Sequence, residues 1–114
     1  MRHSVTCNPW EVWIVPFPFV DAPQTKRRPV VVISGEAFHS QNQHAIATMI
    51  TSSQRHAWAG DTPIRDLEPA GLSIPCLIRL KLFTLDYRLL MRPIGQLSEQ
   101  DQQALQQALR LHVG

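Results

Sequence analysis

Three cationic side chains stand together at Lys26-Arg27-Arg28, and a run of hydroxyl and polar side chains follows the next apolar segment. A guanidinium keeps its charge at every physiological pH and donates two hydrogen bonds to one phosphate or carboxylate. Hydroxyl groups bind the same anionic oxygens. Such residues predict contacts with nucleic acid or with an acidic protein segment, and the candidates in the second run are Thr51, Ser52, Ser53, Gln54 and Arg55. An ordinary solvated turn is the alternative for both runs.

Proton transfer near this cluster has two candidates, His56 and Glu11. His56 is the only histidine near the polar run, and imidazole titrates close to neutral pH. A solvated loop histidine is the alternative. His39 and His44 are five positions apart and match no metal-ligand spacing, so we expect no metal site and no cofactor. Tryptophan side chains can stack on nucleobases, but core or dimer packing is the preferred interpretation for Trp10, Trp13 and Trp58.

Short β-branched and aromatic runs predict that strands hold these residues in place. Prolines put the first run at a sheet edge or strand end, whereas the unbroken apolar run around Val30–Ile33 indicates burial on both faces. In the fifth run, alternation predicts buried Ile78, Leu80 and Leu82 and exposed Arg79, Lys81 and Phe83. The predicted strands are 11–19, 29–34, 45–51, 61–64, 74–83 and 89–97.

Ser98-Glu99-Gln100-Asp101 has the form of a helix N-cap followed by acidic residues. It predicts a helix from about Ser98 to Leu111, with Leu105 and Leu109 on its apolar face. Several short strands followed by one helix predict a mainly β fold, a small and partly open barrel with a C-terminal α-helix.

The composition, 44% hydrophobic and 18% charged residues in a chain of 114, predicts one folded domain and excludes disorder. We expect residues 1–9 to form a flexible extension. Trp13–Val20, the longest stretch without polar side chains, is too short to span a membrane. Without a secretory signal the sequence indicates a cytoplasmic protein, in which Cys7 and Cys76 stay reduced.

Five sequence blocks in order resemble the MazF/PemK-like toxin family: residues 15–19, 26–34, 50–53, 70–72 and 94–98. The resemblance covers most of the chain from about Trp10. It implies an SH3-like barrel of the Kid/MazF/CcdB type that forms a homodimer. It also implies the toxin of a type II toxin-antitoxin system, a metal-independent endoribonuclease that cleaves single-stranded RNA. A cognate antitoxin with an acidic, disordered tail would restrain this activity.

Two positions match the family's catalytic residues. Arg28, followed by Pro29, matches the catalytic arginine, and Thr51 matches the active-site threonine. Cleavage of RNA without a metal needs positive charge on the transition state and groups that accept and donate protons. The RNA groove would take its remaining contacts from Lys26, Arg27, Ser52, Ser53, Gln54, Arg55, Arg79 and Lys81.

The chain departs from the family pattern at two places. Trp10-Glu11 stands where relatives commonly have Gly-Asp, and Arg79-Leu80-Lys81-Leu82 stands where some relatives carry an acidic residue proposed as the catalytic base. The second departure leaves an alternative open, a catalytically weak barrel that binds an antitoxin or a protein target, as gyrase inhibitors of this fold do. A DNA-binding repressor is disfavoured, because no helix-turn-helix is recognisable.

Overall fold

The computed structural model describes residues 6–17, 26–52 and 56–114, and its main element is an antiparallel sheet. Six strands follow one another in the order β4-β5-β3-β2-β1-β6. The strands are β1 (Glu11–Phe17), β2 (Lys26–Val32), β3 (His44–Thr51), β4 (Thr62–Pro63), β5 (Leu77–Asp86) and β6 (Arg92–Gln96). The helices are α1 (Glu36–Asn42), α2 (Glu99–His112) and the 3₁₀ turn η1 (Tyr87–Leu89).

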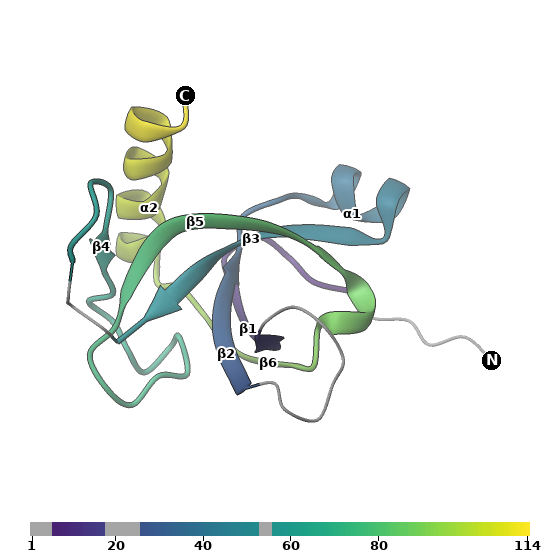
Figure 1. Ribbon diagram of the computed structural model, residues 1–114, viewed down its shortest axis with the longest axis horizontal. Helices are drawn as coiled ribbons and strands as arrows, with labels where there is room; N and C mark the ends of the chain where they lie inside the picture. The colour runs from purple at the N-terminus through teal and green to yellow at the C-terminus, as the bar shows by residue number, and fades with distance from the viewer. Residues whose placement is uncertain (1–5, 18–25, 53–55) are drawn as a thin grey trace.

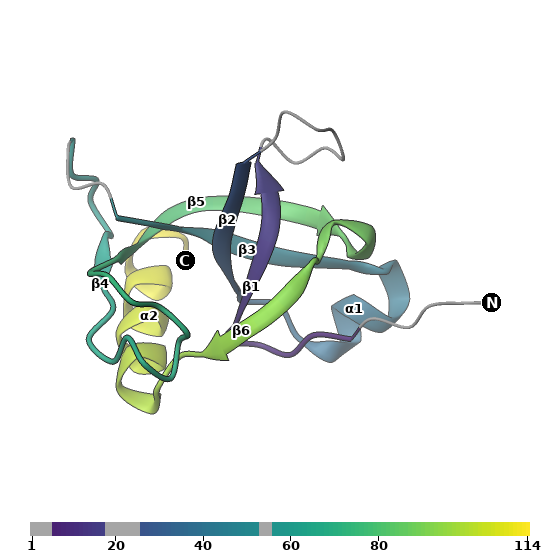
Figure 2. The same cartoon turned by 90° about the horizontal axis from the view of Figure 1, so that it is seen from below.

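The sheet curls into a half-barrel. Figure 1 shows β5 arching over β3 and β2, and Figure 2 shows β6 lying along β1. This arrangement confirms the predicted mainly β fold with a C-terminal helix. The predicted strand positions are confirmed to within a few residues, although the last strand begins only at Arg92, after η1.

Both faces of the sheet carry an apolar core, which explains why the β2 sequence does not alternate. Val30 and Val32 of β2 belong to one cluster with Trp13, Val15 and Leu85, whereas Val31 belongs to a second cluster. The second cluster includes Val12, Ile50, Ile78, Leu97 and Leu105. The predicted burial of β2 on two faces is confirmed.

The burial predicted along β5 is wrong at three positions. Arg79 is buried, Phe83 packs against the first cluster, and Leu82 is 38% exposed. Burial along β5 does not alternate: Ile78 and Arg79 are both buried, whereas Lys81 and Leu82 are both exposed. The register with β3 shifts at this point, because the neighbours Thr48 and Met49 pair with Leu82 and Arg79.

Helix α1 occupies a stretch that the sequence analysis treated as a polar loop. Its buried residue His39 connects the helix to the sheet. The Ser34 hydroxyl accepts a hydrogen bond from the backbone N–H of Ile46 at 2.8 Å and lies 2.6 Å from His39 Nε2. His39 Nδ1 lies 3.1 Å from the carbonyl oxygen of Cys7, which can only accept a hydrogen bond, so Nδ1 is the donor of this contact. The ring therefore bonds the segment before β1 through Nδ1 and Ser34, which follows β2, through Nε2.

The part of the predicted flexible extension that the structure describes packs against the domain from Cys7 onward. Cys7 is 3% exposed and belongs to the first cluster, so the expectation of flexibility is wrong for Cys7. Burial raises the pKa of its thiol. Trp10 then adopts a φ of 75°, a left-handed conformation that favours glycine, and its N–H donates to the carbonyl of Val32. This strained turn leads into β1.

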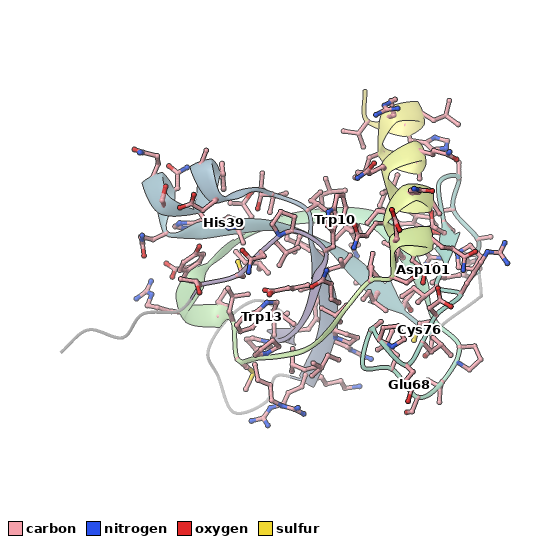
Figure 3. All side chains as sticks on the ribbon, turned by 180° about the vertical axis from the view of Figure 1, so that it is seen from behind. Trp10, Trp13, His39, Glu68, Cys76 and Asp101 are labelled. Carbon is pink, nitrogen blue, oxygen red and sulfur yellow. The ribbon has the colours of Figure 1, made fainter. Side chains whose placement is uncertain are left out.

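The predicted helix α2 is confirmed, including its N-cap. The Ser98 hydroxyl accepts a hydrogen bond from the N–H of Asp101, and Leu105 is fully buried in the second cluster. Asp101 is also fully buried, and its carboxylate accepts hydrogen bonds from the N–H groups of Arg65 and Asp66 at 3.0 and 2.9 Å. Figure 3 shows Asp101 at the first turn of α2, above the segment that carries Glu68 and Cys76. This carboxylate therefore ties the helix to the segment that follows β4.

No helix among the described residues is both long enough and apolar enough to cross a membrane.

Candidate active site

The pairing of β2 with β3 brings the two predicted catalytic residues together. Val30 pairs with Met49 in antiparallel register. Arg28 lies two residues before Val30 on β2, and Thr51 lies two residues after Met49 at the end of β3, so the register brings the two residues to the same part of the sheet. Arg28 and Thr51 line one cleft of about 300 Å³, together with Arg27 and Ser52.

A second part of the cleft lining is the segment Gly71–Cys76, which we call the cleft wall. Its residues Leu72, Ser73, Ile74 and Cys76 line the cleft. The rest of the lining is apolar and consists of Ile14, Pro29, Ile50 and Ile94. The cleft lining therefore combines cationic and hydroxyl-bearing residues, a set of apolar residues and a mainly apolar wall.

Two glycines allow the wall to approach β6. Gly71 has a φ of 76°, and a Cβ atom there would overlap the carbonyl group of Ile94. A Cβ atom on Gly95 would overlap the backbone of Pro69 and Ala70. Only glycine permits such close approach of two backbones. The contact places Ile94 at the cleft beside the wall.

The cationic groups at the cleft have no carboxylate partner within the described part of the chain. Arg27 and Arg28 are exposed on β2 and take part in none of the ion pairs there. Lys26 precedes them and is also exposed, but it does not line the cleft. Exposed guanidinium groups such as these donate hydrogen bonds to anionic oxygens.

The structure corrects the expected position of Arg79. Its guanidinium donates to both oxygens of Asp61, at 3.1 and 2.9 Å, and lies 5.1 Å from the centroid of the Trp58 ring. The hydrogen bond from Arg79 lowers the pKa of Asp61, and the same pairing raises the pKa of Arg79. Arg79 does not line the cleft, because its guanidinium pairs with Asp61 and lies near the ring of Trp58. Lys81 is exposed on β5 and does not line the cleft either.

The two candidates for proton transfer also lie outside the cleft lining. Glu11 begins β1 and pairs with Gln96, whereas Arg28 pairs with Val15, further along the same strand. The Glu11 carboxylate accepts hydrogen bonds from the N–H of Asn8 at 2.8 Å and from the Trp13 indole at 3.0 Å. It thus stabilises the turn before β1. His56 is exposed with a φ of 54°. Ser53, Gln54 and Arg55 lie outside the described residues.

Sequence reasoning did not identify the cleft wall as part of the site. Its signal was the Ala70-Gly71-Leu72 block, which served only to mark the resemblance. Cys76, for which the sequence predicted only a reduced thiol, lines the cleft, and burial raises the pKa of this thiol. Within residues 6–17, 26–52 and 56–114, no three His, Cys, Asp or Glu side chains gather into a group that could bind a metal ion.

Comparison with known families decides the classification of this chain. The model of the PemK-like, MazF-like toxin of type II toxin-antitoxin systems matches residues 8–113. The chain belongs to this toxin family. The resemblance inferred from five sequence blocks is confirmed, and the MazF/PemK-type toxin is seen here as a curled sheet with a C-terminal helix.

Solved structures share this fold. One, described as an endoribonuclease in complex with its cognate antitoxin from a mycobacterial species, has a TM-score of 0.75 at 14% identity and covers 96% of each chain. The Mycobacterium tuberculosis toxin MazF-mt6 has a TM-score of 0.68 at 23% identity, covering 87% of this chain and 91% of its own. MazF from Deinococcus radiodurans has a TM-score of 0.69 at 20% identity, covering 98% and 99%. Comparison with curated protein sequences gives no match.

Proposed function

We propose that this MazF/PemK-type toxin is an endoribonuclease that cleaves single-stranded RNA in the cleft between β2, β3 and the cleft wall. The observation that carries the proposal is the convergence of Arg28 and Thr51, from separate strands, on one cleft whose arginines have no described carboxylate partner. Family membership and the endoribonucleases among its structural neighbours support the same activity.

Arg27 and Arg28 supply the electrostatic part of the reaction. Attack of a 2′-hydroxyl on the adjacent phosphate builds negative charge on the phosphoryl oxygens, and guanidinium groups donate to those oxygens. In this proposal the hydroxyls of Thr51, the last residue of β3, and of Ser52 bind the same phosphate, since both residues line the cleft. The reaction breaks the bond to the 5′-oxygen and leaves a cyclic phosphate.

Proton transfer is not assigned to Glu11 or His56 in this proposal. The Glu11 carboxylate accepts hydrogen bonds from the Asn8 and Trp13 N–H groups. Neither Glu11 nor His56 lines the cleft. No carboxylate or imidazole is present among the described lining residues. Lys26, exposed beside the arginines, contributes to long-range attraction of the phosphate backbone.

The test is incubation of the purified protein with mixed-sequence RNA in EDTA. We expect discrete fragments that end in cyclic phosphate. Arg28→Ala should reduce the rate by about 10²–10³, the usual effect of removing one preorganised donor. Arg110→Ala, an exposed arginine on α2, is the matched control and should cleave normally. Absence of fragments from wild-type protein, or a normal rate with Arg28→Ala, would refute the proposal and favour the alternative of a non-catalytic binding module.

We further propose that a cognate antitoxin with an acidic, disordered tail occupies the same cleft. Lys26, Arg27 and Arg28 provide the complementary charge. At physiological ionic strength, salt largely screens the attraction between exposed charges that are more than about 8 Å apart. Titration with a Glu-rich peptide at two salt concentrations tests this, and inhibition of cleavage should weaken as salt rises. Binding that leaves cleavage unchanged would place the tail elsewhere.

The proposed working form is a cytoplasmic homodimer. The apolar face of α2 does not supply the dimer surface, because Leu105 and Leu109 pack in the second cluster of their own chain. The surface left for a partner includes the edge strand β6 and exposed Met91 beside it. Light scattering at micromolar protein should give the mass of a dimer, and a monomeric mass would refute this part of the proposal.

A further inference from the structure

The cleft wall differs in chemistry from the side of the cleft that carries the arginines. Ile74 is 54% exposed although it is a large apolar residue, and Leu72 lies beside it in the lining. Ser73, between them, is exposed and supplies a hydroxyl group. The wall thus presents apolar side chains and one adaptable hydrogen-bonding group to the same cleft that Arg27 and Arg28 line.

The wall is anchored at both ends. At its start, the N–H of Gly71 donates to the carbonyl of Glu68 at 2.9 Å, and the N–H of Leu72 donates to Leu67 at 3.0 Å. At its other end, the carbonyl of Cys76 accepts from the N–H of Ile64 at 3.0 Å. Together with the close contacts of Gly71 and Gly95, these bonds hold the wall in place before any ligand binds. A preorganised surface of this kind discriminates between ligands better than a mobile one.

The size of the cleft limits what the wall can contact. A volume of about 300 Å³ is at the lower end for ligand pockets, which span about 300–1,000 Å³. It suits a single nucleotide. A phosphate bound by Arg27 and Arg28 would leave an adjacent nucleobase within reach of the apolar lining and the wall, which belong to the same cleft.

Resting on the proposed RNA cleavage, we propose that the cleft wall selects the base next to the cleaved phosphate. Ser73 and Ile74 are its specificity-determining residues. The side chain of Ile74 contacts the face of an unstacked base, as apolar and aromatic groups do in recognition of single-stranded RNA. The Ser73 hydroxyl, which both donates and accepts, bonds the edge of that base.

The experiment measures cleavage-site preference with a random-sequence RNA pool for the wild type, Ser73→Ala and Ile74→Ala. Both side chains are exposed, so their loss leaves the fold intact. The controls are Ser40→Ala on α1 and Leu111→Ala on α2, which are exposed residues of the same polarity that lie outside the cleft. Fragment ends are sequenced, and the preference at each position around the cut is compared.

We expect Ser73→Ala to reduce the preference at one position next to the cut by about 2–10-fold, the worth of one net hydrogen bond. Ile74→Ala should weaken binding of a non-cleavable 2′-deoxy analogue by about 10-fold, because it removes roughly two methylene equivalents of contact. The two controls should leave both measurements unchanged. Preferences that stay at wild-type values in both wall variants would overturn the proposal.

This result is separable from failure of the proposed function. If the wild type cleaves, Arg28→Ala does not, and both wall variants keep the wild-type preference and affinity, only the wall proposal fails. If the wild type neither cleaves the pool nor binds the 2′-deoxy analogue, both proposals fail. If the wall variants change only the affinity for an acidic peptide, the wall is a protein contact, and its role in base selection is refuted.

Discussion

Replacement of Asp101 tests whether α2 holds the segment that becomes the cleft wall. The carboxylate is fully buried and accepts two backbone hydrogen bonds, from Arg65 and Asp66. A hydrogen bond to a charged group contributes about 1.5–3 kcal/mol net, but residues 65 and 66 are not buried, so water replaces part of each bond. We expect Asp101→Ala to lower the free energy of unfolding by about 2–4 kcal/mol. Asp101→Asn, which keeps one accepting oxygen, should lose about half as much.

Glu99→Gln is the matched control for this prediction. Glu99 and Asp101 both lie in the first turn of α2, so both interact with the helix dipole, but Glu99 is exposed. Its replacement should cost no more than about 0.3–1 kcal/mol. Urea unfolding followed by tryptophan fluorescence measures the free energy of unfolding of each variant. All substitutions are made in the Arg28→Ala variant and measured at the same protein concentration. Equal losses for Asp101→Ala and Glu99→Gln would refute the assigned role.

Three other perturbations have defined outcomes. Because Arg79 lowers the pKa of Asp61, their pairing stabilises the fold above the usual Asp pKa and this stabilisation disappears as pH falls through the lowered value. Asp61→Asn should therefore lower the free energy of unfolding at neutral pH but not in strong acid. An equal loss of this free energy under the two conditions would contradict the pairing. Gly95→Ala should lower the melting temperature by several degrees, because its Cβ would overlap the backbone at Pro69, and an unchanged melting curve would exclude that contact. Burial raises the pKa of Cys76, so iodoacetamide should label it more slowly at neutral pH than in the urea-unfolded chain. Mass spectrometry measures that rate, and labelling should block cleavage because the thiol lines the cleft.

Local signals made part of this fold predictable. The Ser98 cap and the acidic first turn lie within four residues of one another and were sufficient to place α2. The double-faced burial of β2 follows from its unbroken run of valines. Arg28 and Thr51 could be selected by residue type and by family resemblance, but their meeting depends on the register of two strands, which the structure supplies.

The remainder depended on contacts between distant parts of the chain. Helix α1 has only seven residues, too few for an amphipathic signal, and its anchor is the buried contact of His39 with Ser34 and Cys7. Alternation in the sequence predicted that Arg79 is an exposed cation. Its partner Asp61 is eighteen positions away in the sequence, and only the fold brings the two side chains together. The cleft wall was also not predicted, because its position depends on a contact between distant residues, Gly71 and the backbone at Ile94.

The pairing of β1 with β6 has a consequence for the synthesis of this toxin. Residues 11–14 of β1 are synthesised early, but β6 (residues 92–96), one of the two strands that pair with β1, is synthesised much later. Ile94 of β6 lines the cleft. A ribosome must therefore release the chain past Ile94 before the cleft exists. Partial products that end before β6 would lack both this strand and the close contacts that position the cleft wall. Under the proposed function, a growing chain that has not yet released β6 lacks the assembled cleft and would not cleave the messenger that encodes it.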